Sequence, residues 1–261
     1  MPRVLLLGGL DPSGGAGITA DATVIALHHA QALPIAIAFT EQNRLAFRRC
    51  YPVPSEQWCR ALHAVLEEGE VHAVKVGLIA DTLTLRTVAR ELTALRGQVP
   101  IVVDPVLSAT AGGLIANSDL AAAYLELLVP ITTVFTPNVP ELAAVCEGDA
   151  KRALAAGAEA VLAKGGHAEG VHCEDVLWQG DERLAFVRSR QHVGPVRGTG
   201  CALASAIAAR MAHGAGIAQA CRRGGDWLAA LLRVLGSASQ DGLPRSLPFG
   251  RALPVLDAPL A

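Results

Sequence analysis

The sequence lacks a basic excess. It holds 22 lysine and arginine residues against 24 aspartate and glutamate residues, so its net charge is −2. Proteins that bind the phosphate backbone of nucleic acids carry a clear positive excess, and we therefore expect no nucleic-acid partner. The apolar run near the N-terminus, Val4–Leu7, is too short for a signal-peptide core or a membrane span. We expect a soluble cytoplasmic protein without a membrane partner.

Cysteine pairs at redox or metal-binding spacing are also missing. The six cysteines are Cys50, Cys59, Cys146, Cys173, Cys201 and Cys221. Their irregular spacing indicates reduced thiols rather than a disulfide framework or a zinc site. The chain has no G-K-[ST] sequence and no G-x-G-x-x-G between a strand and a helix, which argues against a Walker nucleotide site and a nicotinamide dehydrogenase.

Lysine is scarce, since the basic residues include only Lys75, Lys151 and Lys164. Lys75 and Lys164 lie in apolar, strand-like runs, where an ammonium group without a partner is costly to bury. Each of these two lysines therefore has either a role in a site or a carboxylate partner that serves packing alone. The sequence leaves both alternatives open.

The chain of 261 residues is long enough for one large α/β domain, and we assign residues 1–261 to a single domain. Short, continuous apolar runs alternate with longer helical patterns, which is typical of parallel strands covered on both faces. The predicted strands are Val4–Leu7, Ile35–Phe39, Ala73–Ile79, Ile101–Asp104, Val134–Thr136 and Ala160–Lys164. This pattern predicts an α/β fold with a mostly parallel central sheet.

Local signals mark the ends of several elements. Ser55 and Asp81 are expected to be the N-caps of two amphipathic helices. The runs Asp175–Trp178 and Leu184–Val187 flank a turn, which predicts an antiparallel hairpin at the sheet edge. The segment Ser237–Ala261 is rich in proline and small residues, and we expect it to be irregular.

Polar residues and glycines follow the predicted strands where those strands end. In an open α/β sheet, ligands bind at the carboxyl ends of the strands, so these residues are candidates for a site. The candidates are Gly8–Gly17, Gln42, Asn43, Asp104, Asn138, Glu141 and Lys164–His167. Any one of them could be only a cap or a turn residue, but five such groups on one edge favour a binding site.

The stretch Arg197–Cys201 combines small residues with the start of a helical pattern. The first turn of a helix has backbone N–H groups without intrahelical partners and a partial positive charge, so glycines there let an anion approach closely. Cys201 lies in that turn, where the helix N-terminus is expected to favour thiolate over thiol. A proton acceptor beside an anion site suits a group-transfer enzyme, although a glycine-rich helix start with a structural cysteine would look the same.

The motifs, taken in chain order, are Gly9–Gly17, Gln42-Asn43, Lys75-Val76-Gly77, Val103–Val106, Asn138-x-x-Glu141, Lys164–His167 and Gly198–Cys201. This series resembles the hydroxymethylpyrimidine and phosphomethylpyrimidine kinases of thiamin biosynthesis, within the ribokinase superfamily. The resemblance implies a ribokinase-like three-layer sandwich with helices on both faces of the sheet. It also implies that ATP and Mg²⁺ are used to phosphorylate 4-amino-5-hydroxymethyl-2-methylpyrimidine and then its monophosphate, and that the protein is a homodimer.

The resemblance further implies a role for each matching residue. Cys201 corresponds to the catalytic base, and Gly198, Thr199 and Gly200 to the anion hole beside it. The implied substrate-binding residues are Gly9, Asp21, Gln42, Leu78 and Val106. Those on the ATP side are Asp104, Asn138, Glu141 and Lys164, of which Asp104 and Glu141 would also hold Mg²⁺.

Three positions depart from the family pattern. Thr110 stands where a lysine is frequent, Arg197 stands where a histidine is usual, and Glu41 precedes Gln42 where small or neutral residues are usual. On a strand, Glu41 would point away from the face of Gln42. Two alternatives remain open at this point: a pyridoxal or pyridoxine kinase of the same superfamily, and a regulatory homologue that binds the pyrimidine without turnover.

Overall fold

A nine-stranded sheet forms the middle of the computed structural model, which describes residues 1–108, 118–166, 170–236 and 244–251. Thr110, His167 and most of Ser237–Ala261 lie outside the described residues. Across the sheet the strands are β3 (Phe47–Pro52), β2 (Gln31–Gln42), β1 (Arg3–Leu10), β4 (Ala73–Val76), β5 (Ile101–Val103), β6 (Val134–Phe135), β7 (Ala160–Ala163), β8 (His172–Gln179) and β9 (Glu182–Ser189).

The middle of the sheet is parallel and both of its edges are antiparallel. Strands β2, β1, β4, β5, β6 and β7 run parallel to one another, whereas β3 pairs antiparallel with β2, and β8 and β9 form the predicted hairpin beside β7. Strand β3 was not predicted. Its six residues are exposed or half-buried, so they carry no apolar run that could indicate a strand.

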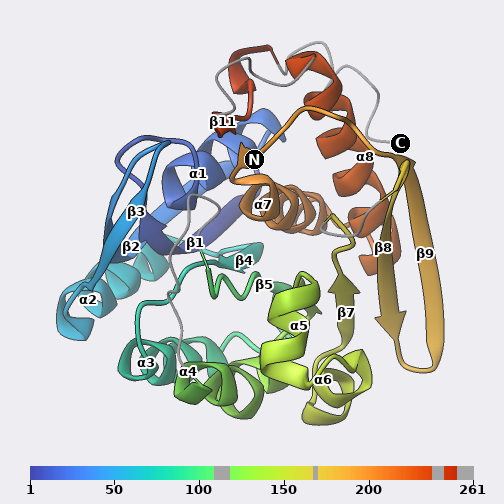
Figure 1. Ribbon diagram of the computed structural model, residues 1–261. Coiled ribbons are helices and arrows are strands. Elements are labelled where there is room, and N and C mark those ends of the chain that lie inside the picture. Colours follow the sequence, from blue (N-terminus) through green and yellow to red (C-terminus); the bar gives the residue numbers. More distant parts are fainter. Residues whose placement is uncertain (109–117, 167–169, 237–243, 252–261) are drawn as a thin grey trace.

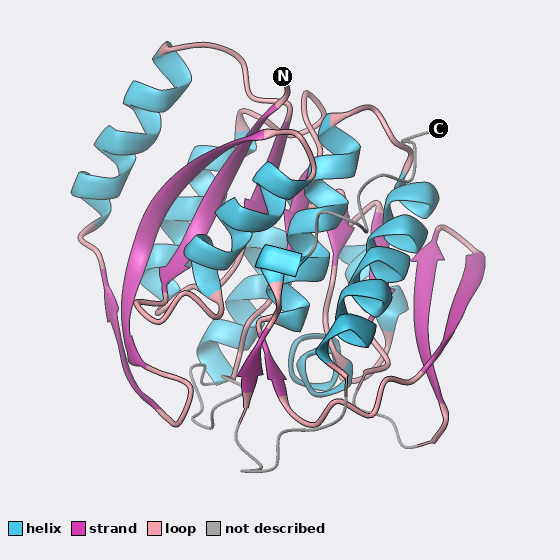
Figure 2. Ribbon diagram, turned by 90° about the horizontal axis from the view of Figure 1, so that it is seen from above, coloured by secondary structure: helices cyan, strands magenta, loops and turns pink. Residues whose placement is uncertain are grey.

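Helices cover both faces of the sheet, which confirms the predicted three-layer arrangement (Figures 1 and 2). One face carries α1 (Gly17–Leu27), α7 (Thr199–Ala212) and α8 (Ile217–Leu235). The other carries α2 (Ser55–Glu67), α3 (Thr82–Thr93), α4 (Ser118–Ala123), α5 (Val139–Cys146) and α6 (Ala150–Ala156). Between α4 and β6 lie η1 (Tyr124–Leu128) and η2 (Val129–Ile131). No helix in the described ranges is long and apolar enough to cross a membrane.

Strand β1 shows why the buried strands have continuous apolar runs. Leu5 and Leu7 pack into the core on the side of α2 and α3, whereas Val4 and Leu6 pack into the core on the side of α1 and α7. All four side chains are fully buried. Because successive side chains of a strand point to opposite faces, a strand with two covered faces has no polar side.

One of the two expected helix N-caps is confirmed and the other is wrong. Asp81 is an N-cap as predicted, and its carboxylate accepts a hydrogen bond from the Thr84 N–H at 2.7 Å. Ser55 is instead the first residue of α2, and Pro54 holds the N-cap position with no side-chain cap bond. Ser55 therefore lies one residue too late to cap the helix.

The C-terminal segment is not wholly irregular. Within it, β11 (Arg245–Ser246) pairs in parallel with β10 (Val196–Arg197), and the one-turn helix η3 spans Phe249–Arg251. Two paired residues give too short a pattern for prediction. The pairing places this segment beside the strand that leads into α7.

Candidate active site

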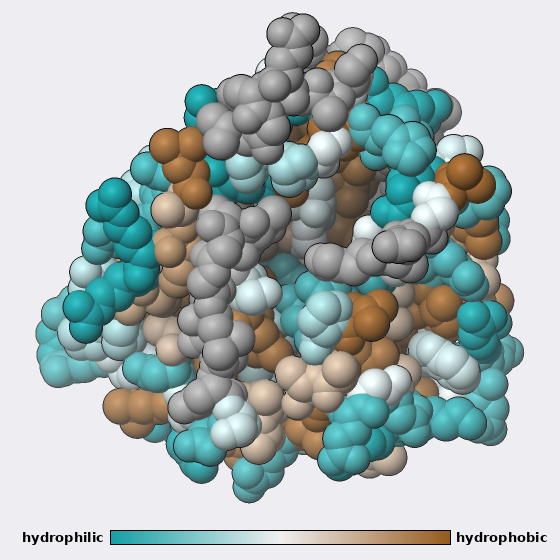
Figure 3. All heavy atoms as spheres, in the orientation of Figure 1, coloured by the Kyte–Doolittle hydropathy of each residue, from teal (hydrophilic) through white to brown (hydrophobic). Residues whose placement is uncertain are grey.

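A cavity of about 650 Å³ lies at the carboxyl edge of the parallel strands, beside the first turn of α7. Figure 3, drawn in the orientation of Figure 1, shows a hollow in this face of the molecule. The predicted site residues on the cavity wall are Gly9, Gln42, Leu78, Val106, Asp104, Asn138, Glu141, Lys164, Gly198, Thr199, Gly200 and Cys201. The fold therefore gathers segments that are far apart in the sequence around one space, as the strand-end rule predicts.

The start of α7 has the geometry of an anion site. Gly198 is its N-cap in the left-handed conformation, with φ 76°, and no side chain caps the free N–H groups that follow. A Cβ on Gly198 would lie 2.3 Å from the carbonyl oxygen of Gly15, so only glycine fits this close approach. The uncapped N–H groups and the helix dipole together favour a bound anion beside Cys201.

A cluster of one ammonium and two carboxylates adjoins the same turn. Lys164 Nζ donates to Asp104 Oδ1 at 2.6 Å and lies 3.9 Å from Glu141 Oε2. Burial disfavours the charged form of Lys164, but Asp104 and Glu141 outweigh it and raise the pKa of the ammonium. A Cβ on Gly200 would lie 3.2 Å from Lys164 Nζ, so this cluster touches the anion site.

The Asn138-x-x-Glu141 motif begins α5 as a capping box. The Asn138 side chain accepts from the Glu141 N–H at 2.9 Å, and Glu141 Oε2 accepts from the Asn138 N–H at 2.8 Å. Burial and, to a smaller extent, the nearby Asp104 raise the pKa of Glu141 to about 7, against the opposing effect of Lys164. The motif therefore has a structural role, and it also leaves a buried carboxyl on the cavity wall.

Cys201 is the third residue of α7 and keeps partial exposure to the cavity. It lies deep among protein atoms, and this burial raises the pKa of its thiol to about 12, with Asp104 and Asp21 adding to the rise. Lys75 and the Gly17 N–H act in the opposite direction. The expectation that the helix N-terminus would favour thiolate is therefore wrong for the protein without ligands, because desolvation is the larger effect.

Three residues named with the site lie away from the cavity wall. Asp21 is fully buried in α1, where it accepts from Lys75 Nζ at 2.7 Å and from Ser205 Oγ at 2.8 Å. Asn43 accepts from the N–H groups of the β2–β3 turn, so it is a turn residue. Glu41 is exposed and bonds Arg48 and Tyr51 on β3, which confirms that it points away from Gln42.

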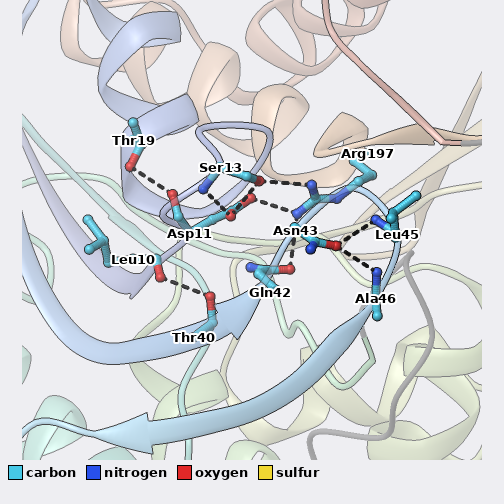
Figure 4. Close-up of polar contacts among 10 residues, drawn as sticks. All are labelled: Leu10, Asp11, Ser13, Thr19, Thr40, Gln42, Asn43, Leu45, Ala46 and Arg197. Carbon is cyan, nitrogen blue, oxygen red and sulfur yellow. Dashed lines mark hydrogen bonds and ion pairs between the residues drawn. The ribbon is translucent and has the colours of Figure 1, made fainter.

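Gln42, at the end of β2, is held by a buried arginine (Figure 4). Arg197 Nη2 donates to Gln42 Oε1 at 3.1 Å and to Asp11 Oδ2 at 2.7 Å, while Nη1 donates to Ser13 Oγ at 2.9 Å. Arg197 is only 2% exposed. The positive charge of Arg197 is therefore matched inside the protein by the carboxylate of Asp11.

The cavity continues to the β9 edge of the sheet, where the sequence predicted a hairpin but no site residues. Its wall there comes from β9, the following loop and α8, including Arg188, Arg190, Gln191, Val193, Leu228 and Leu232. Arg188 bonds Asp175 at 3.0 Å and Asp226 at 2.8 Å. A Cβ on Gly225 would lie 2.4 Å from its guanidinium group. The glycine pair Gly224-Gly225 inside a helical pattern was the available signal.

The sequence matches a known family over most of its length. A family model described as phosphomethylpyrimidine kinase matches residues 11–242. The chain belongs to this family. The hydroxymethylpyrimidine/phosphomethylpyrimidine kinase of Mycobacterium tuberculosis is 35% identical to this chain over 245 residues, which are 89% of each protein. The protein of the same name from Rhizobium meliloti is 34% identical over 227 residues, 83% of this chain and 85% of its own length.

Solved structures share the fold of this phosphomethylpyrimidine kinase family member. A pyridoxal kinase from Staphylococcus aureus, in complex with AMP-PCP and pyridoxal, matches with a TM-score of 0.84 at 21% identity, over 96% of this chain and 94% of its own. Phosphomethylpyrimidine kinase from Clostridium difficile 630 matches with a TM-score of 0.77 at 24% identity, over 88% of this chain and 99% of its own. These matches confirm the predicted ribokinase-like α/β fold.

Proposed function

We propose that the protein transfers the γ-phosphoryl group of ATP to the hydroxyl of 4-amino-5-hydroxymethyl-2-methylpyrimidine, and a second phosphoryl group to the resulting monophosphate. The supporting observation is that one cavity joins an amide at Gln42, an uncapped helix start at Gly198 and the Lys164 cluster. An amide can pair with a nitrogen heterocycle, and the other two groups suit phosphates. The named relatives carry the same two activities in their names.

In the first reaction, the hydroxymethyl oxygen forms a bond to the γ-phosphorus while the bond from that phosphorus to the bridging oxygen breaks and ADP leaves. The hydroxyl proton passes to the Cys201 thiolate and then to solvent. The N–H groups at the start of α7 would hold the oxygens of the transferred group. Because the pKa of the thiol is about 12, the thiolate is a minor form at neutral pH, and Lys75 favours that form.

The residues around Lys164 fit a hydrated Mg²⁺ ion. The described residues contain no cluster of three or more histidine, cysteine or acidic side chains placed to hold a metal. Mg²⁺ keeps several waters and binds through one or two carboxylates plus substrate phosphates, so Asp104 and Glu141 would suffice. Both carboxylates share the single ammonium of Lys164, which leaves negative charge for a cation. When bound, the ion would neutralise charge on the phosphates of ATP.

Phosphorylation of two alcohols and one phosphate monoester side by side tests this proposal. Hydroxymethylpyrimidine, its monophosphate and pyridoxal are each incubated with ATP and Mg²⁺ in a coupled ADP assay. We expect kcat/KM for both pyrimidines to exceed that for pyridoxal by at least tenfold. Faster turnover of pyridoxal would make the protein a pyridoxal kinase. Tight pyrimidine binding in calorimetry without any ADP release would make it a regulatory homologue.

The resemblance also leads us to propose a homodimer in the cytoplasm. The chain has a mass of 27.0 kDa, so light scattering after size exclusion should give about twice that value. Cell fractionation should recover the protein with soluble cytoplasmic markers. A monomer mass, or recovery with membranes, would contradict these two expectations without affecting the activity proposal.

A further inference from the structure

Arg197 joins three segments that surround the Gln42 end of the cavity. Its Nη2 bonds both Asp11, in the loop after β1, and Gln42, the last residue of β2. Its own backbone belongs to β10 and leads directly into Gly198 at the start of α7. A Cβ on Gly15 would lie 3.2 Å from Arg197 Nη1, so the guanidinium also packs against the loop after β1.

The chemistry of the two side chains fixes how the Gln42 amide faces. A guanidinium group has only hydrogen-bond donors, so the part of an amide that meets it must be the oxygen. The amide nitrogen of Gln42 then points away from Arg197, as Figure 4 shows. Among the described residues, none accepts a hydrogen bond from that nitrogen, and Gln42 lines the cavity. A free amide would present either end, whereas this one presents its N–H groups.

We infer that Arg197 is a positioning residue that holds the Gln42 amide with its N–H groups toward the ligand, so that the site selects a heteroaromatic alcohol with a ring nitrogen acceptor facing Gln42. This inference rests on the proposed function and adds its selectivity. The remaining lone pair of Gln42 Oε1 accepts a neighbouring amine, which sets the order of donor and acceptor along the ligand edge. The Asp11 carboxylate, 1% exposed, holds the guanidinium in place.

The test uses a neutral replacement of the buried pair, Asp11→Asn with Arg197→Gln, because removing Arg197 alone would leave the Asp11 carboxylate buried without a partner. A glutamine at position 197 both donates and accepts, so it imposes no direction on Gln42. We expect the pyrimidine KM to rise about tenfold, a loss of the size expected for one misdirected buried hydrogen bond. The ATP KM and kcat should stay within twofold. Arg3→Gln with Glu68→Gln, which neutralises an arginine–carboxylate pair at 2.7 Å away from the cavity wall, is the matched control and should keep the unmodified KM.

Coupling to Gln42 separates positioning from a general packing effect. In a Gln42→Ala background, the double replacement should change pyrimidine affinity, measured by calorimetry, by less than twofold. A carbocyclic analogue with C–H groups in place of both ring nitrogens should bind the unmodified protein at least tenfold more weakly than the pyrimidine, and this ratio should shrink in the double replacement. Multiplicative losses in the combined variant, or an unchanged KM in the double replacement, would overturn the inference.

Failure of the proposed function would appear in a different measurement from failure of the Arg197 inference. The unmodified protein would then not turn over the pyrimidine. In that case the coupling between positions 197 and 42 is measured on pyridoxal affinity, since pyridoxal also carries a ring nitrogen. A protein that binds neither compound would overturn both statements. A protein that phosphorylates the pyrimidine but shows no coupling between positions 197 and 42 would overturn only the role of Arg197.

Discussion

Cys201 lies both at the N-terminus of α7 and deep among protein atoms, and these surroundings change the pKa of its thiol in opposite directions. A helix N-terminus stabilises a negative charge by about 0.3–1 kcal/mol, whereas full burial can shift a pKa by about 3–5 units. Burial therefore dominates. None of the six cysteines has a lowered thiol pKa, so rapid alkylation of Cys201 is not expected in the protein without ligands.

Cys201→Ala should affect the two proposed reactions unequally. The alcohol must lose a proton, whereas the phosphate of the monophosphate is largely ionised at neutral pH because its second pKa is about 6. General-base assistance is worth about 10²–10⁴ in rate, so kcat for the alcohol should fall at least about 100-fold and kcat for the monophosphate by less than about tenfold. Both are measured at saturating ATP. Cys50→Ala, half-buried on β3, is the control. Equal losses for both substrates would assign Cys201 a positioning role instead.

Glu141→Gln should raise the Mg²⁺ concentration needed for half-maximal activity and stabilise the metal-free fold at alkaline pH. The pKa of Glu141 is raised to about 7 in the folded protein, so the folded state holds this proton more tightly than the unfolded chain does. The bound proton contributes its full stability below about pH 4, and that stability is lost as the pH rises through 7. Glutamine keeps the capping box without the charge. Urea unfolding should show a gain of about 1–3 kcal/mol at pH 8 and almost none near pH 4. Glu67→Gln, exposed on α2, is the control; a gain independent of pH would contradict the assignment.

At the scale of elements, α7 is the helix around which the site is organised. It packs against α1, α8 and the central strands β4 and β5, and its first turn lies between two buried lysine–carboxylate pairs. Lys75 on β4 bonds Asp21 on α1, which also accepts from Ser205 on α7, so one carboxylate links three elements. These links fix the position of the first turn of α7 relative to the sheet.

Lys75→Met should destabilise the fold by about 3–5 kcal/mol, because it leaves the Asp21 carboxylate buried without its cation. Adding Asp21→Leu should recover most of that loss, since an apolar pair of similar volume replaces the buried ions. The free energy of unfolding in urea measures both. The recovered double variant should still phosphorylate the alcohol more slowly, because Lys75 no longer favours the Cys201 thiolate. Full recovery of that rate would limit Lys75 to packing.

For the whole molecule, the sequence was sufficient to predict the central parallel strands, the β8–β9 hairpin and the edge of the sheet at which the cavity lies. Those features depend on apolar runs and on strand ends, which are local signals. Strand β3 could not be predicted, because its exposed and half-buried residues carry no apolar run. The pairing of β11 with β10 could not be predicted either, because the two strands are short and lie far apart in the sequence.

Within the site, residue types were predictable but electrostatic and hydrogen-bond states were not. The helix start at Gly198 was visible in the sequence, whereas the pKa of Cys201 depends on burial by several elements. The family resemblance also pointed to Asp21, but its partner Lys75 lies 54 residues away in the sequence, and the two residues pair only in the folded protein. The Arg197–Gln42 bond joins residues 155 apart and has no sequence pattern.

The bond between Arg197 and Asp11 spans 186 residues of chain, and it has a consequence for synthesis on the ribosome. The strand that leads to Asp11 is made first, and its arginine partner emerges only after the eight further strands of the sheet and most of the helices. For most of translation, which proceeds at about 5–20 residues per second, the Asp11 carboxylate of the nascent chain therefore has no Arg197 to pair with. A partial chain that ends before Arg197 cannot place the first turn of α7 beside Gln42, so it lacks the anion site proposed for the phosphates of ATP.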